Sequence, residues 1–265
     1  DLEEFEDYLK KVDAEKNLVT ADADLVRSWM VYLMEKGRSV ATVNRKLSSL
    51  RSFYRFLLRR RVVDLDPMLK VVGPKKQKTL PSFLRVQEMD RLLDECSVNE
   101  GFEGVRDRLI LEMFYATGMR LSELIGLSDA DVDLSAKLLK VTGKRNKQRL
   151  IPFGEELWMD LLGYIKLRNE TLPDRDDALF VRKDGKRMYP ELVYKIVRRN
   201  LSKVATLKKR SPHVLRHTFA TAMLNGSAEL QAVKELLGHE SLATTEIYTH
   251  TTFEELKKVY EQAHP

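Results

Sequence analysis

The chain has 265 residues, of which 43% are hydrophobic and 32% charged, so it can build one large domain or two modest ones. Its one cysteine, Cys96, excludes a disulfide framework within the chain and fits a reducing, cytoplasmic setting. No apolar run approaches the roughly 18 residues of a membrane-spanning helix, and we find no signal peptide. The chain begins at Asp1, already inside an amphipathic pattern, and we expect a few native residues to precede it.

Basic residues are concentrated in two blocks. Lysine and arginine outnumber aspartate and glutamate by 46 to 40, which gives a formal net charge of +6. Residues 37–63 contain no acidic side chain, and a second basic cluster spans residues 198–210. Two such blocks in separate parts of a chain favour a long polyanion held from more than one side, although either block alone also fits a solvated helix face.

The first third of the chain predicts a helical domain. Apolar residues recur at helical spacing in residues 1–12, 22–37 and 39–61. The last of these segments carries its apolar residues on one side and most of its arginines on the other. Such a helix can pack on its own domain and face DNA.

Proline, glycine and lysine residues mark a boundary after this helical region. We place a linker at residues 74–82, between a domain at 1–73 and a second domain at 83–265. The second domain opens with three segments of helical pattern. They are residues 86–96, 105–118 and 120–127.

The middle of the second domain predicts a small β-sheet. Residues 137–153 indicate two short strands around a basic turn, and residues 178–189 indicate a third strand with a turn at Asp184 and Gly185. After Pro190 the pattern is helical, with interruptions near 211–212, 226, 238 and 251. The predicted fold is therefore mainly α with a small β-sheet, with a helical N-terminal domain followed by an α+β domain.

Polar residues with catalytic potential recur through the second domain. They are Arg120 with Glu123 one turn later, Lys144, His213, Arg216, His239 and Tyr248. A zinc site is one interpretation of these residues, because His213 and His217 have the spacing of the two histidines in the HExxH motif. That motif needs glutamate as general base where this chain has Val214, which argues against zinc hydrolysis.

Phosphate chemistry fits this residue set better. Two arginines can hold non-bridging phosphate oxygens by paired hydrogen bonds, and a histidine can move a proton near neutral pH. A lysine can protonate a leaving oxygen, and a tyrosine can attack phosphorus and hold it covalently. Each residue alone also has an ordinary structural interpretation, such as packing for a tyrosine or solvation for a lysine in a turn.

Four segments resemble, in order, the signature segments of tyrosine recombinases, most closely the Xer-type branch of the integrase family. They are "ATGMRLSELIGL", "VTGKRNKQRLIPF", "SPHVLRHTFATAML" and "LLGHESLATTEIYTH". Near the start, "ATVNRKLSSLRSFYRFL" is similar to the family's helical core-binding domain. The resemblance covers nearly the whole chain. It implies a SAM-like core-binding domain followed by an α+β tyrosine-recombinase catalytic domain.

The resemblance also implies a reaction. Tyr248 would attack a DNA phosphate to give a 3′-phosphotyrosyl link and a free 5′-hydroxyl, without ATP, a metal or another cofactor. Lys144 would be the general acid for the leaving 5′ oxygen. The family usually has Gly-Lys-Gly at this turn, whereas here Arg145 follows Lys144, so Lys147 stays an alternative acid.

The remaining motif residues would surround the phosphate. Arg120 and Arg216 would hold its non-bridging oxygens, and His239 would donate a hydrogen bond to it. His213 would assist proton transfer at the tyrosine. Glu123 would support the cluster of arginines and histidines.

The partners implied are a double-stranded DNA recombination site and further protomers. Four protomers, identical or paired with a paralogue, would assemble on two sites by exchange of a C-terminal helix at about 253–263. Packing of that helix on its own chain is the alternative. The expected DNA contacts are Arg45, Lys46, Arg51, Arg55, Arg145, Lys147, Arg198 and Arg199.

The preferred function is Xer-type resolution of chromosome or plasmid dimers, which links the protein to chromosome partition and cell division. An integrase of a mobile element is the alternative within the family. A catalytically silent DNA-binding protein and a relaxing topoisomerase are the alternatives of other classes. The target DNA sequence and any need for an activating protein are not readable from the chain.

Overall fold

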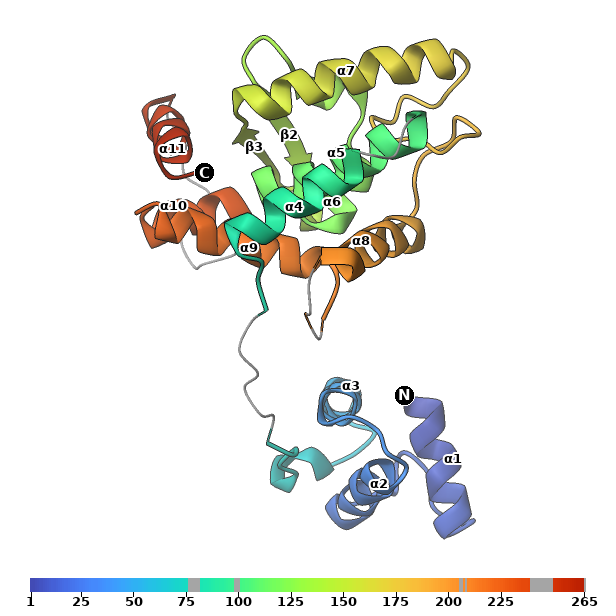
Figure 1. The fold of residues 1–265 in the computed structure, drawn as a ribbon. Helices are drawn as coiled ribbons and strands as arrows, with labels where there is room; N and C mark the ends of the chain where they lie inside the picture. The colour runs from blue at the N-terminus through green and yellow to red at the C-terminus, as the bar shows by residue number, and fades with distance from the viewer. Residues whose placement is uncertain (76–81, 98–100, 205–206, 208, 239–249, 265) are drawn as a thin grey trace. The chain divides into compact units, whose positions relative to one another are not determined.

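A computed structural model describes residues 1–75, 82–97, 101–204, 207, 209–238 and 250–264. The chain divides into two compact units, Asp1–Leu80 and Pro81–Pro265. Both are built largely from helices, and the second also contains one small sheet (Figure 1). This is the predicted mixture of α and β structure. Among the described helices, none combines the length and apolar character needed to cross a membrane.

The first unit is a small helical domain. Its elements are α1 (Leu2–Val12), α2 (Ala23–Glu35), α3 (Val40–Arg59) and a 3-10 turn, η1 (Pro67–Lys70). Side chains fix two helix starts, because Asp22 accepts from the Leu25 amide and Ser39 from the Thr42 amide. Trp29 is fully buried in the hydrophobic core of this domain.

The second unit is organised around one buried helix. Its elements are α4 (Val86–Ser97), α5 (Phe102–Thr117), α6 (Leu121–Gly126), η2 (Asp129–Asp131), β1 (Val132–Asp133), β2 (Leu138–Thr142), η3 (Lys144–Asn146), β3 (Gln148–Pro152), α7 (Glu155–Thr171), α8 (Pro190–Val204), α9 (Pro212–Asn225), α10 (Leu230–Leu237) and α11 (His250–Ala263). Helix α5 packs against α4, α7 and α9. It ends at Gly118, whose φ of 58° is a left-handed conformation that glycine adopts readily.

The sheet is antiparallel, in the order β1-β2-β3. Strands β2 and β3 form the predicted hairpin, with Leu139 opposite Ile151. The third strand was predicted in the wrong place. Residues 178–189 make only isolated bridges, such as Val181 with Arg187, and the short β1 occupies the third position in the sheet. The turn expected at Asp184 and Gly185 is present, with Gly185 at a φ of 76°.

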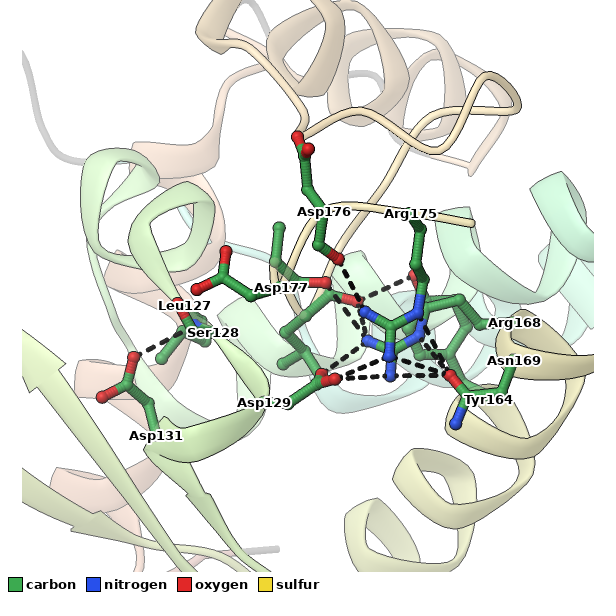
Figure 2. Close-up of polar contacts among 12 residues, drawn as sticks. Leu127, Ser128, Asp129, Asp131, Tyr164, Arg168, Asn169, Arg175, Asp176 and Asp177 are labelled. Carbon is green, nitrogen blue, oxygen red and sulfur yellow. Dashed lines mark hydrogen bonds and ion pairs between the residues drawn. The ribbon is translucent and has the colours of Figure 1, made fainter. Parts of the chain in front are cut away.

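A buried arginine explains why residues 178–181 do not form a ladder. Arg168 of α7 is fully buried and donates to the carbonyl oxygens of Ala178 and Leu179, at 3.2 and 2.7 Å. It also pairs with Asp129 at 2.7 Å, and Arg175 approaches the same carboxylate at 2.7 Å (Figure 2). The carbonyl oxygens of Ala178 and Leu179, which a neighbouring strand would need as acceptors, are thus occupied by the Arg168 side chain.

The last helix packs on its own unit in this single chain. Helix α11 contacts α9 and α10, and its residues Leu256, Tyr260 and Ala263 are buried. Contact with α9 is close, because a Cβ on Gly226 would lie 2.2 Å from the carbonyl oxygen of Ala263. This is the arrangement in cis, and exchange of the helix between protomers stays a prediction.

Candidate active site

Three of the predicted site residues line one pocket. Arg120, His213 and Arg216 surround a cavity of about 100 Å³, whose other walls are Met119, Leu121, Tyr194 and Pro212. Arg120 is the residue before α6, and only Gly118 and Met119 separate it from the end of α5. His213 and Arg216 lie in the first turn of α9, which begins at Pro212, a residue well suited to the first helical position. Segments about ninety residues apart in the sequence thus meet at this cavity.

Three arginines bind successive carbonyl oxygens at the end of α10. Arg149 Nε donates to Leu236 at 2.8 Å, Arg216 Nη2 to Leu237 at 2.7 Å and Arg120 Nη2 to Gly238 at 2.9 Å. The last carbonyls of a helix lack partners within the helix and carry partial negative charge. The arginines therefore satisfy them and fix the point at which the chain leaves α10.

Arg216 is held from a second helix as well. Its Nη1 donates to the carbonyl oxygen of Gly118, at the end of α5, at 2.6 Å. Burial lowers the pKa of Arg216 to about 10, and the nearby charge of Arg120 acts in the same direction. The guanidinium is still positively charged at neutral pH. It has five N–H donors, and bonds to carbonyl oxygens of the described residues use two of them.

Glu123 links two of these arginines. Its carboxylate accepts from the Arg120 backbone amide at 2.7 Å and from Arg120 Nη1 at 2.8 Å. Arg149 donates to both carboxylate oxygens, at 2.8 and 3.0 Å. Burial of Glu123 raises the pKa, but these hydrogen bonds and the charge of Arg149 outweigh it and hold the pKa at about 2. The carboxylate is therefore ionised at neutral pH.

Arg149 was missed by the sequence reasoning. It lies in β3 two residues before the buried Ile151, so both side chains are on the same face of the strand. A charged residue on the buried face of a strand needs a buried partner. That alternation was the available signal, and the basic composition of the turn obscured it.

Lys144 lies at the exposed turn between β2 and β3. The Gly143 amide donates to the Lys147 carbonyl at 2.8 Å and closes the turn. Both lysines are exposed, and neither lines the pocket, so the geometry leaves both as candidate acids. Arg145 stands where the resemblance would have glycine, and its φ of 59° is the left-handed conformation that glycine favours.

Two predicted residues lie outside the described part of the chain. His239 and Tyr248 belong to residues 239–249, which begin directly after Gly238. His217, the second histidine of the zinc hypothesis, has its pKa lowered by burial and by His213. Within the described residues, no three His, Cys, Asp or Glu side chains are grouped as metal ligands.

The expected DNA contacts differ in how they are held. Arg55 and Arg198 are exposed, while Arg51 donates to the Val71 carbonyl at 3.0 Å. Arg45 pairs with Asp1 at 2.8 Å, and Arg199 pairs with Asp107 at 2.8 Å. Arg45, Arg51 and Arg55 belong to α3, and Arg198 and Arg199 belong to α8.

Lys46 is the least exposed of the expected DNA contacts. Its side chain is only 7% exposed and pairs with Asp1 at 3.1 Å and with Glu4. Two carboxylates of the first helical segment therefore occupy the ammonium group. Lys46 links the start of α1 to α3 within the domain, so a DNA contact would require these ion pairs to open.

Comparison with known proteins identifies the family. Residues 82–255 match the model of the phage integrase family, and residues 1–61 match that of the phage integrase N-terminal SAM-like domain. The chain belongs to the phage integrase family. Tyrosine recombinase XerC of Chlorobaculum tepidum is 39% identical to this phage integrase, over 100% of this chain and 87% of the relative. Tyrosine recombinase XerD of Oceanobacillus iheyensis is 37% identical, over 100% and 90%.

Solved structures of recombinases share the fold. The XerH site-specific recombinase bound to its difH substrate, in a pre-cleavage complex, is 26% identical with a TM-score of 0.72, over 94% of this chain and 74% of that one. The XerA recombinase is 28% identical with a TM-score of 0.56, over 99% and 88%. These likenesses confirm the predicted fold class and the assignment of the chain to the tyrosine recombinases.

Proposed function

We propose that this phage integrase cuts and rejoins DNA at a specific site through a 3′-phosphotyrosyl intermediate on Tyr248. The observation that carries the proposal is the convergence of Arg120, His213 and Arg216 on one pocket. Two guanidinium groups beside an imidazole can bind a phosphodiester and stabilise the charge that its transition state gathers. We assign this catalysis to residues 83–265 and DNA core binding to residues 1–73, joined by a linker at 74–82.

The proposed step is a transesterification. The Tyr248 oxygen bonds to phosphorus as the bond from phosphorus to the 5′ oxygen breaks. The phenolic proton passes to His213, and Lys144 gives a proton to the departing 5′ oxygen. Attack by a 5′-hydroxyl of a partner strand reverses each transfer, so no external energy source is consumed.

The two arginines have donors suited to this role. Arg216 uses two of its five N–H donors in bonds to carbonyl oxygens of the described residues, and it is buried, which strengthens its interaction with a phosphate oxygen. Arg120 is pre-oriented by Glu123, so less freedom is lost when it binds. His239 would add a hydrogen bond from the chain that continues past Gly238.

The biological role we propose is Xer-type resolution of chromosome or plasmid dimers on double-stranded DNA. Relatives named XerC and XerD align over the whole of this chain, and XerH has been solved on a difH substrate. We propose four protomers on two sites, identical or with a paralogue. Because α11 packs in cis in the single chain, exchange would require its release.

A suicide-substrate assay tests the chemistry. Nicked duplexes carrying a site selected from random sequence by the wild-type protein would be incubated with wild type and Tyr248→Phe in EDTA. We expect a covalent protein–DNA band with wild type alone. Tyr189→Phe is the matched control, because that phenol is 42% exposed and lies outside the pocket. A covalent band that persists in Tyr248→Phe would exclude Tyr248 as the nucleophile.

A further inference from the structure

Arg149 lies where the hairpin, helix α6 and helix α10 meet. Its two Nη atoms bind both oxygens of Glu123, and its Nε binds the carbonyl oxygen of Leu236. All three donor atoms of the guanidinium are therefore engaged, and the side chain is only 12% exposed. A planar guanidinium held in this way has one orientation, which an ammonium group could not reproduce.

The other strand of the hairpin reaches the same carboxylate. A Cβ placed on Gly143 would lie 3.4 Å from Glu123 Oε1, so the backbone before Lys144 runs directly beside the carboxylate. Across the hairpin, Arg149 pairs with Val141 in the strand register. Strand β3 is thus bonded to Glu123 through Arg149, and the turn that carries Lys144 begins beside the same carboxylate.

We propose that Arg149 is a positioning residue that sets where Lys144 stands relative to the bound phosphate. Arg149 ties β3 to the same carboxylate that orients Arg120. The position of Lys144, the proposed general acid, and the orientation of Arg120 therefore both depend on the carboxylate of Glu123. We call Arg120 and Arg216, the two arginines at the pocket, the arginine clamp. The inference rests on the proposed function and deepens it, because it concerns protonation of the leaving 5′ oxygen.

Leaving-group chemistry separates this role from a role in the arginine clamp. A 5′-bridging sulfur in place of the 5′ oxygen departs as a thiolate and needs no proton from a general acid. A defect in placing Lys144 should therefore be relieved on the sulfur substrate. A defect in the clamp should persist, since the non-bridging oxygens are the same in both substrates.

The experiment compares single-turnover cleavage of two nicked duplexes that differ only in that bridging atom. The proteins are wild type, Arg149→Gln, Arg149→Lys, Lys144→Ala and Arg120→Lys. On the oxygen substrate we expect Arg149→Gln to be slowed about 100-fold, the order of loss that follows a displacement of about 1 Å. On the sulfur substrate we expect both Arg149 variants and Lys144→Ala to approach the wild-type rate, while Arg120→Lys stays slow.

A matched arginine controls for loss of stability. Arg187 also binds two carbonyl oxygens, those of Ile125 and Leu127, and pairs with Asp177, but it lies outside the pocket. Arg187→Gln should show the same ratio of oxygen to sulfur rates as wild type. Thermal unfolding identifies any variant that does not fold, and Arg149→Lys retains the charge if Arg149→Gln fails.

Two results would overturn the inference. If an Arg149 variant is equally slow on both substrates, Arg149 acts through the arginine clamp. If an Arg149 variant cleaves the oxygen substrate at the wild-type rate, Arg149 does not position Lys144. Failure of wild type to form a covalent product on either duplex is a separate outcome. It would overturn the proposed function, and the inference with it.

Discussion

Arg216 donates a hydrogen bond of 2.7 Å to the carbonyl oxygen of Leu237, the last residue of α10. One residue of the proposed phosphate clamp thus also fixes the end of the helix from which the chain continues to His239. The same guanidinium holds the end of α5 through Gly118. Changes in the clamp should therefore alter the local fold as well as phosphate binding.

Replacing Glu123 by Gln should lower stability in a pH-dependent way. The folded-state pKa of about 2 lies below the ordinary 4.5, so the ionised carboxylate stabilises the fold above pH 4.5. That stabilisation is lost as pH falls through about 2. We expect wild type to exceed Glu123→Gln by about 2–3 kcal/mol at pH 6, from the size of the shift. Urea unfolding at pH 6, 4 and 3 would measure this gap, and a gap unchanged across these pH values would contradict the assignment.

Replacing Gly118 by Ala should destabilise the catalytic unit. Its φ of 58° disfavours a side chain, and the new Cβ would lie 2.4 Å from Phe219 and 2.8 Å from Leu237. Backbone strain and overpacking together suggest a loss of about 3 kcal/mol. The control is Gly163→Ala in the middle of α7, where no atom lies within 4 Å of the added Cβ. There we expect a gain of about 0.5–1 kcal/mol, and equal effects at both positions in urea unfolding would refute the argument.

Replacing Gly226 by Ala should weaken the packing of α11 in cis. Gly226 has a φ of −76°, so the alanine backbone is unstrained, and the effect comes from the clash with Ala263. Hydrogen exchange followed by mass spectrometry should show faster exchange of the amides at 256–264. Gly163→Ala serves again as the control. Protection that is identical to wild type would mean that the contact at Gly226 does not hold the helix.

Arg55 and Lys46 should differ in their effect on DNA binding. Arg55 is exposed, so Arg55→Ala should reduce the slope of log affinity against log salt by about 0.9 if it contacts one phosphate. Lys46 is buried against Asp1 and Glu4, so Lys46→Met should leave that slope unchanged and lower stability instead. Fluorescence anisotropy at several salt concentrations would test both, with urea unfolding of each variant. A reduced slope in Lys46→Met would show instead that this lysine contacts DNA.

Local sequence pattern predicted most of the elements, because helix periodicity and glycine stops act within short windows. Gly118 and Gly238 end α5 and α10 in left-handed conformations, as their positions indicated. The third strand was wrong because tertiary contacts decide it. The backbone of Ala178 and Leu179 is bound by Arg168, and nothing in the local apolar pattern distinguishes that arrangement from a strand.

The candidate site was predictable only as a set of residue types in order. Sequence order shows neither that Arg120 reaches the Gly238 carbonyl, 118 positions away, nor that Lys46 is buried by the start of the chain. Arg149 belongs with these, because its partners come from α6 and α10. Long-range pairing of this kind depends on how the helices pack.

The arginines at the two helix ends also set the net charge around the pocket. Three positive charges, on Arg120, Arg149 and Arg216, are opposed by the carboxylate of Glu123 and by the C-terminal ends of α5 and α10. Each helix end carries roughly half a negative charge, which leaves roughly one positive charge uncompensated. That excess matches a single phosphodiester in its ground state. The additional negative charge of the transition state would then call for further donors, and His213 at the pocket and Lys144 on the exposed turn are the candidates.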